Sequence, residues 1–298
     1  MNSVVEVKGL TKAYAGSIAI DNISFTIEEN KIYGLLGRNG AGKTTLMQIL
    51  TAQLFETSGQ IKVFGEYPYE NQKVLSQICF IKESQKYPDN FRVVDVLELS
   101  TLLFPNWNKE FAYSLIEQFQ LPLKRRMKKL SRGMLSAVGI VVGLASRAPL
   151  TFFDEPYLGL DAVARGIFYD RLLEDYALFP RTVILSTHLI DEVSQLLEHV
   201  IVIDQGKILI DDEAETLRGR ATTIVGAASK VEAFVMGRKA IHREPFGGIL
   251  SVTILGELDL HDHKLLNDLG LERSPVSLQQ MIVHLTNGKW DRKAGDAI

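Results

Sequence analysis

The stretch "GRNGAGKTT", Gly37 to Thr45, constrains the fold of this chain more than any other segment. It matches the pattern G-x-x-x-x-G-K-[ST], a glycine-rich loop that cradles phosphate groups. The continuous apolar run "KIYGLLG" before it predicts a buried strand, and "KTTLMQILTAQL" after it has helical spacing. Strand, loop and helix in this order are the context that the motif requires, which disfavours a merely structural glycine turn.

The residue types in this loop suit the phosphates of a nucleotide. Glycines let backbone N–H groups close around phosphate oxygens, and the following helix N-terminus adds partial positive charge. Lys43 can reach the β- and γ-phosphates, and the Thr44 hydroxyl can bind Mg²⁺. The predicted nucleotide-binding residues of the loop are Asn39, Gly40, Ala41, Gly42, Lys43, Thr44 and Thr45.

A second strand carries two acids. "LTFFDEP" ends a buried apolar run with Asp154, which can hold Mg²⁺, and Glu155, which can polarise an attacking water as a general base. Two adjacent acids at a strand end can also cap a helix or lie in a solvated turn. The phosphate loop upstream favours the catalytic interpretation.

Strands that alternate with helices predict an α/β fold with a sheet covered on both faces. The interval between Lys43 and Asp154 is far longer than the ~30 residues of one βαβ unit. The helical stretch 84–148 therefore reads as an insertion. The pattern changes near Leu217–Arg220, so we expect a nucleotide-binding domain over 1–220 and a small α+β domain over 221–298.

Bulk properties exclude several other classes. The net charge is −3, and the basic run Lys124 to Lys129 lacks the interleaved aromatics and wide basic field of a nucleic-acid site, so no nucleic-acid partner is predicted. Cys79 is the single cysteine and fits a reducing compartment. No apolar run reaches ~18 residues and the N-terminus lacks signal-peptide character, which predicts a cytoplasmic protein.

Four further motifs occur along the chain in a fixed order around the phosphate loop and the paired acids. Together, these motifs resemble those of the ATP-binding subunit of an ABC transporter. The aromatic Tyr14 in "KAYAGSIAI" lies where that family stacks a ring on adenine. "LSRGM", with Ser131 and Gly133, occupies the signature position. "LGLDA", with Asp161, resembles the loop that bridges two subunits. "LSTH" places His188 where the family contacts the γ-phosphate.

The resemblance covers about residues 3–220 and implies a P-loop ATPase core with an inserted helical subdomain. It implies ATP and Mg²⁺ as ligands, with Glu155, His188 and Lys43 as the catalytic residues. In this family two ATPase subunits enclose two ATP molecules, so it also implies a homodimer or a heterodimer with another ATPase subunit. Transmembrane permease subunits are the implied partners. The implied location is the inner face of the cell membrane.

Two positions depart from the family pattern. The signature usually reads LSGGQ, and here Arg132 and Met134 replace a glycine and the glutamine. Ser131, Gly133 and the following helix keep the features that the chemistry needs, so we expect the variant to work. In the loop that usually carries a glutamine, "ICFIKESQKYPDNF", the register favours Glu83 at that position over the nearby Gln85. A carboxylate there can bind Mg²⁺, and its negative charge near the γ-phosphate can slow turnover.

The tail "VSLQQMIVHLT" and the signature resemble ATPases of Gram-positive, ABC-2-like export operons, which predicts an exporter. A slow, ATP-gated regulatory subunit is an alternative, suggested by Glu83 and Arg132. A soluble ABC ATPase of translation or DNA repair is another. Translation factors usually carry two cassettes, and repair ATPases insert a long coiled coil, for which no sustained heptads appear between Lys43 and Ser131.

Overall fold

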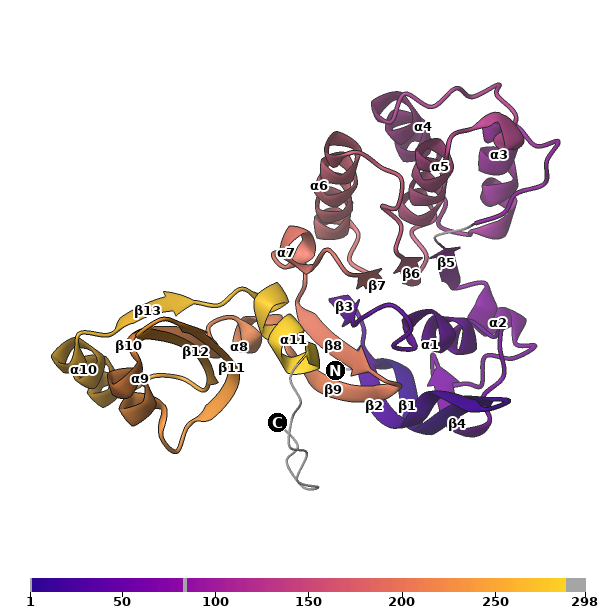
Figure 1. Ribbon diagram of the computed structural model, residues 1–298. Helices are drawn as coiled ribbons and strands as arrows, with labels where there is room; N and C mark the ends of the chain where they lie inside the picture. Colours follow the sequence, from indigo (N-terminus) through magenta and orange to yellow (C-terminus); the bar gives the residue numbers. More distant parts are fainter. Residues whose placement is uncertain (1, 83–84, 288–298) are drawn as a thin grey trace. The chain divides into compact units, whose positions relative to one another are not determined.

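The computed structural model describes residues 2–82 and 85–287. Within these ranges the chain forms two compact units (Figure 1). The first runs up to His188 and takes in Leu196–Asp211. The second consists of Leu189–Gln195 and the chain from Asp212 onward.

A six-stranded sheet forms the frame of the first unit, in the order β5-β6-β7-β3-β8-β9. The pairs β5–β6, β6–β7, β7–β3 and β3–β8 are parallel. Strands β3 and β6 form from the two predicted apolar runs, and every residue of both strands is buried. Burial on both faces explains why these strands read as continuous apolar runs. The strands are β3 (Ile32–Leu36), β5 (Ile78–Lys82), β6 (Leu150–Asp154), β7 (Thr182–Thr187), β8 (His199–Asp204) and β9 (Lys207–Glu213).

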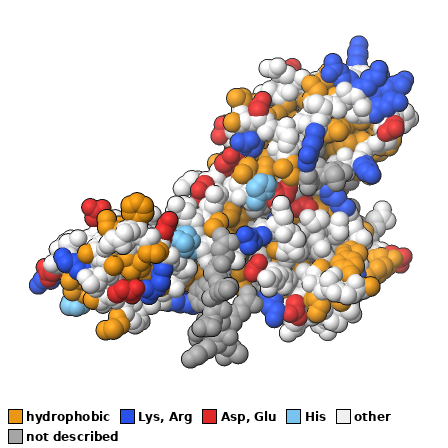
Figure 2. Space-filling model, in the orientation of Figure 1, with side chains coloured by type: hydrophobic (Ala, Val, Ile, Leu, Met, Phe, Trp, Pro, Cys, Tyr) orange, Lys and Arg blue, Asp and Glu red, His pale blue; other side chains and the backbone are white. Residues whose placement is uncertain are grey.

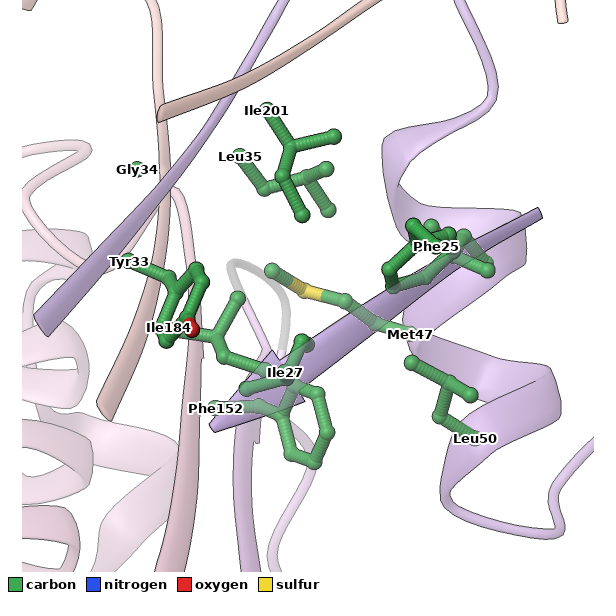
Figure 3. Close-up of a pocket in the computed structure, with 11 residues that line it drawn as sticks. Phe25, Ile27, Tyr33, Gly34, Leu35, Met47, Leu50, Phe152, Ile184 and Ile201 are labelled. Carbon is green, nitrogen blue, oxygen red and sulfur yellow. The ribbon is translucent and has the colours of Figure 1, made fainter. Parts of the chain in front are cut away.

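A smaller antiparallel sheet, in the order β2-β1-β4, packs on this frame together with helix α1. Figure 3 shows the core between them, where Met47 and Leu50 of α1 point toward Phe152, Ile184 and Tyr33 around a small apolar cavity. This packing fixes the start of α1, and therefore the phosphate loop before it, against the sheet. The elements are β1 (Ser3–Tyr14), β2 (Ser17–Glu28), β4 (Ser58–Val63) and α1 (Lys43–Leu50).

The other face of the frame is covered by α5 and α6 (Figure 1). Phe153 follows Phe152 along β6 and points to the opposite face, where its ring meets Phe168 of α6 edge to face at 5.2 Å. A Cβ on Gly143 of α5 would stand 2.4 Å from the Phe153 ring, so the helix lies directly on the strand. The sheet is thus covered on both faces, as the alternating pattern predicts.

The inserted stretch between β5 and β6 is helical, which confirms the predicted subdomain. It contains a basic surface, and Figure 2 shows Lys and Arg side chains gathered at this end of the first unit. In the run 124–129 the five basic side chains are exposed around buried Met127. Its elements are α3 (Val93–Leu103), α4 (Lys109–Gln118), the 3-10 turn Met127–Lys129 and α5 (Arg132–Ala145).

The helical spacing of "IDEVSQLLEH" predicts a single helix over this stretch, and the prediction is wrong. Only α7 (Ile190–Val193) is helical, and His199 already begins β8. The imidazole Nε2 of His199 lies 2.7 Å from Asp211 Oδ1 of β9, and Glu198 Oε2 accepts from the Ile32 amide at 2.8 Å. Pairing with the sheet therefore overrides the local helical periodicity. The other two helices of the core are α2 (Gln72–Leu75) and α6 (Ala162–Leu178).

The second unit is an α+β fold with its own core. Its antiparallel sheet has the order β11-β12-β10-β13, and Phe234 and Val231 of α9 pack with Val252 and Ile254 of β12. In the part of the chain that the structure describes, no helix is long and apolar enough to cross a membrane. The elements are α8 (Ala214–Leu217), β10 (Ala221–Ala227), α9 (Ala228–Val235), β11 (Lys239–Phe246), β12 (Ile249–Leu255), α10 (Leu260–Leu269), β13 (Glu272–Pro275) and α11 (Leu278–Asn287).

Candidate functional site

The phosphate loop joins the end of β3 to the start of α1, and two glycines make its path possible. Gly37 has φ +148°, and a Cβ there would stand 2.1 Å from the carbonyl oxygen of Ile203. Gly42, the residue before α1, has φ +113°, and a Cβ there would meet the carbonyl of Ala19 at 2.6 Å. Both backbone positions exclude a side chain, so the motif glycines have a steric role as well as a chemical one.

The loop encloses a cavity of about 200 Å³. The cavity opens onto the N-terminus of α1, where unpaired backbone N–H groups favour an anion. Ala41, the predicted loop residue that does not line it, is buried and packs in the core. The lining residues are Ala19, Asn39, Gly40, Gly42, Lys43, Thr44, Thr45, Asp154 and Glu155.

The Lys43 ammonium lies at the floor of this cavity and is only 6% exposed. It donates to the carbonyl oxygens of Gly37 at 2.8 Å and Arg38 at 3.2 Å, and stands 3.8 Å from Glu155 Oε1. Burial lowers the pKa of Lys43, and the negative charges of Glu155 and Asp154 act against that shift. A buried cation shared between neutral carbonyls and one carboxylate is well placed to pair with phosphate oxygens.

Thr44 and Asp154 form a set of oxygen donors that fits a magnesium ion. The Thr44 hydroxyl donates to Asp154 Oδ2 at 2.7 Å. The other carboxylate oxygen, Oδ1, is buried and has no hydrogen-bond partner among residues 2–82 and 85–287. Mg²⁺ prefers hydroxyl and carboxylate oxygens beside substrate phosphates, and an unsatisfied buried carboxylate oxygen is costly without a cation.

Glu155 comes next to His188 through the register of two parallel strands. Asp154 of β6 pairs with Ser186 of β7, and the Glu155 amide donates to the Ser186 carbonyl at 3.2 Å. Glu155 itself has φ +50°, which turns the chain sharply at the strand end. Its Oε2 lies 2.8 Å from His188 Nδ1, so the predicted general base is in direct contact with the residue predicted to bind the γ-phosphate.

Tyr157 is a residue of this site that the sequence did not single out. Its side chain is 3% exposed, and its hydroxyl donates to Glu155 Oε2. The same hydroxyl accepts from Thr187 Oγ1 at 2.8 Å and from the His188 amide at 3.0 Å. The sequence signal that could have identified Tyr157 is its position two residues after Glu155. An aromatic side chain at such a position is, however, typical of the hydrophobic core.

The signature segment begins helix α5. Ser131 is the N-cap, and its hydroxyl accepts from the Met134 amide at 3.2 Å. Gly133 packs against the chain at Gly159, and Ser136 Oγ donates to the Leu158 carbonyl at 2.7 Å. The structure thus gives the helix N-terminus that the variant signature requires. None of these residues is among those that line the phosphate cavity.

The remaining predicted residues lie away from this cavity or outside the described structure. Asp161 is the N-cap of α6 and accepts from the Ala164 amide at 2.8 Å. Tyr14 ends β1 with its ring 46% exposed and the Lys12 ammonium 5.0 Å above it. Glu83, the predicted Mg²⁺ ligand of the glutamine-type loop, lies outside the described residues.

Comparison with known proteins places this site in a family. A family model described as "ABC transporter" matches residues 20–158. The ABC transporter ATP-binding protein YcbN of Bacillus subtilis is 28% identical, with 97% of this chain and 98% of that protein aligned. The bacitracin transport ATP-binding protein BcrA of Bacillus licheniformis is 32% identical over 74% of this chain and 73% of its own length. The lantibiotic transport ATP-binding protein SrtF of Streptococcus pyogenes is 32% identical over 70% and 91%.

Solved structures show the same fold. An ATP-binding subunit of an ABC transporter superposes with a TM-score of 0.65 at 23% identity, over 72% of this chain and 91% of that one. A dimeric ATP-binding cassette in a post-hydrolysis state with ADP and Pi gives 0.62 at 20% identity, over 70% and 98%. The fold agrees with these solved structures, and the identities to BcrA and SrtF show that the chain belongs to the ATP-binding subunits of ABC transporters.

Proposed function

We propose that this subunit hydrolyses ATP to drive a bacterial exporter, working as a dimer on separate transmembrane subunits. The observation that carries the proposal is that Lys43 and Glu155 line one cavity, with His188 in contact with Glu155. A cation, a carboxylate and a neighbouring imidazole at a phosphate-sized cavity are the groups that phosphoryl transfer to water requires.

The roles follow from the geometry. Lys43 would exchange its two loop carbonyls for β- and γ-phosphate oxygens, which carry more negative charge. Glu155 Oε1 makes no hydrogen bond among the described residues, so it is the oxygen that would orient the attacking water. His188, whose side chain is 45% exposed, would donate to the γ-phosphate.

A magnesium ion bound by Thr44 and Asp154 would supply charge stabilisation at the phosphate oxygens. Glu83 remains the proposed further ligand. Tyr14 would stack on the adenine, for which its exposed ring at the end of β1 is available.

The dimer is proposed from the signature. Because Ser131 and Gly133 do not line the cavity of their own chain, they are free to face ATP held by another subunit, with Asp161 in the loop between. The dimeric cassette among the structural relatives supports this arrangement. The second subunit would be an identical chain or another ATPase.

Docking to the membrane subunits is proposed at the helical subdomain. The side chains of Leu99, Leu102 and Leu103 on α3 are exposed apolar groups, 83% in the case of Leu102. Apolar exposure of this kind marks an interaction surface. The relatives named for bacitracin and lantibiotic transport support export, and a place on the inner face of the membrane follows from such partners.

The test uses Glu155→Gln with Glu174→Gln, an exposed acid of α6, as the matched control. We expect the wild type and the control to release phosphate from ATP with Mg²⁺, and Glu155→Gln to lose turnover by about 10²-fold or more. Light scattering should then show Glu155→Gln trapped as an ATP-bound dimer. An ATP-bound monomer would contradict self-pairing, and a wild type without turnover in the presence of its membrane subunits would favour the regulatory alternative.

A further inference from the structure

The Tyr157 hydroxyl lies at the junction of three groups of the candidate site. It contacts Glu155 Oε2, His188 Nδ1 at 3.2 Å and Thr187 Oγ1 at 2.8 Å. Its ring also meets the His188 imidazole edge to face, with 5.7 Å between centroids.

Counting donors and acceptors fixes the direction of each bond. The His188 amide can only donate, and Thr187 donates to the same phenol oxygen, so both lone pairs of Tyr157 are occupied. Tyr157 has one proton left to give. Glu155 Oε2 and His188 Nδ1 both lie within its reach, and only one of them can receive it.

In this structure Glu155 receives that proton. His188 Nδ1 also faces Glu155 Oε2 at 2.8 Å, and a carboxylate accepts only, so Nδ1 carries a hydrogen here. A neutral imidazole protonated at Nδ1 presents a lone pair at Nε2. A lone pair would repel an anionic γ-phosphate, so this tautomer does not suit the contact proposed for His188.

We propose that Tyr157 is a positioning residue that switches its hydroxyl proton from Glu155 to His188 Nδ1 when ATP binds. The inference rests on the proposed hydrolysis by Glu155 and His188. Once Nδ1 accepts from Tyr157, the imidazole must carry its hydrogen at Nε2, where it donates to the γ-phosphate. The number of bound protons does not change. His188 releases its Nδ1 proton to solvent and takes a proton from solvent at Nε2, and Tyr157 stays protonated.

The surroundings of Tyr157 support a permanent donor. Burial raises the pKa of the phenol, and the neighbouring Glu155 carboxylate raises it further. The hydroxyl therefore stays protonated throughout the pH range in which an ATPase works. Once the switch has occurred, Glu155 Oε2 has lost both of its donors, the phenol hydroxyl and the Nδ1 hydrogen of His188.

Tyr157→Phe removes this hydroxyl and keeps the buried ring. Tyr33→Phe is the matched control, because Tyr33 is 1% exposed and its hydroxyl accepts a backbone amide, that of Glu28, at 2.9 Å. We expect kcat of Tyr157→Phe to fall at least about tenfold while KM for ATP stays within about twofold. The pH optimum should move to lower pH, because only the doubly protonated imidazole then donates reliably at Nε2. Tyr33→Phe should match the wild type in all three quantities.

Nitrogen-15 NMR of histidine-labelled protein reads the tautomer without needing turnover. His188→Gln assigns the signal. In the wild type His188 should be protonated at Nδ1 without nucleotide and at Nε2 with Mg²⁺ and a non-hydrolysable ATP analogue. In Tyr157→Phe the second form should be lost or replaced by the imidazolium. Thr187→Val, which frees a lone pair of Tyr157 to accept from Nδ1–H, should reduce the same form in a chain that keeps the tyrosine.

Each outcome decides one proposal. Wild-type kcat and pH optimum in Tyr157→Phe, or an unchanged His188 tautomer on binding the analogue, overturns the role of Tyr157 while ATP hydrolysis stands. A wild type that binds the analogue and switches tautomer but releases no phosphate overturns the proposed function and keeps the switch. Should Tyr157→Phe not fold, Thr187→Val carries the same test.

Discussion

Gly133 of the signature segment lies against the backbone of Gly159, which precedes the Asp161 loop. A Cβ on Gly133 would stand 2.3 Å from the Gly159 carbonyl oxygen, closer than any real contact of that kind. The start of α5 and the loop before α6 are therefore packed backbone to backbone. The two segments proposed to meet a second subunit are one rigid surface within a single chain.

Gly133→Ala should break this surface. We expect unfolding free energy to drop by about 1–3 kcal/mol, because the carbonyl cannot yield as a flexible side chain would. The displaced helix N-terminus should also prevent the ATP-dependent dimer of Glu155→Gln. Urea unfolding and light scattering measure the two effects. Gly166→Ala is the matched control, since Gly166 is a helical glycine of α6 with no atom within 4 Å of its missing Cβ. Equal stability of the two variants would refute the packing argument.

Lys43→Met should abolish tight ATP binding. The ammonium is buried beside the cavity, and a charge-assisted bond to phosphate contributes about 1.5–3 kcal/mol, so Kd for ATP should rise by at least tenfold. Lys73→Met is the control, because Lys73 is an exposed lysine paired with Glu66. Fluorescence titration with a labelled ATP gives both values. A Lys43→Met protein that binds like the control would show that the cavity is not the phosphate site.

Asp175→Asn should destabilise the first unit. Asp175 is 4% exposed and accepts from Arg147 at 2.7 Å and from Arg181 at 2.8 Å. Burial lowers the pKa of Arg181, and the Asp175 charge opposes the shift, so removing that charge leaves a buried cation poorly paired. Breaking a buried pair costs about 3–5 kcal/mol. The urea midpoint should fall accordingly, whereas Asp170→Asn, an exposed acid on the same helix, should leave it unchanged.

The second unit should lose stability as the pH falls below about 6.5. The rings of His242 on β11 and His284 on α11 stack with centroids 4.0 Å apart. Burial, and then the charge of His242, lower the pKa of His284, while Glu244 acts in the opposite direction. A histidine with a depressed folded pKa binds fewer protons than the unfolded chain in this window, so its stabilisation is complete above the unfolded value and is lost as pH falls through the folded one.

Hydrogen exchange measures this effect in the full chain. Protection of α11 and β11, corrected for the intrinsic exchange rate, should fall between pH 7.5 and pH 5.5. His284→Gln should flatten that dependence, and His261→Gln, at an exposed position of α10, should not. An identical pH dependence in the two variants would remove the stacked pair as the cause.

Much of the fold could be predicted because apolar periodicity reflects burial directly. β3 and β6 read as buried runs, and the helical insertion reads from its spacing. The segment after Ile190 could not be predicted this way, because its helical pattern competes with strand pairing at His199, and that pairing depends on residues far along the chain.

The sequence by itself determined the chemistry at the phosphate loop. Gly37, Gly42, Lys43 and Thr44 lie within one short loop, so local geometry decides how they can bind a phosphate. Tertiary structure decided the rest of the site. The register of β6 and β7 brings His188 to Glu155, and burial turns Tyr157 inward so that its one proton lies between them. Strand register and burial arise from contacts between distant segments, and for that reason no local pattern of residues records them.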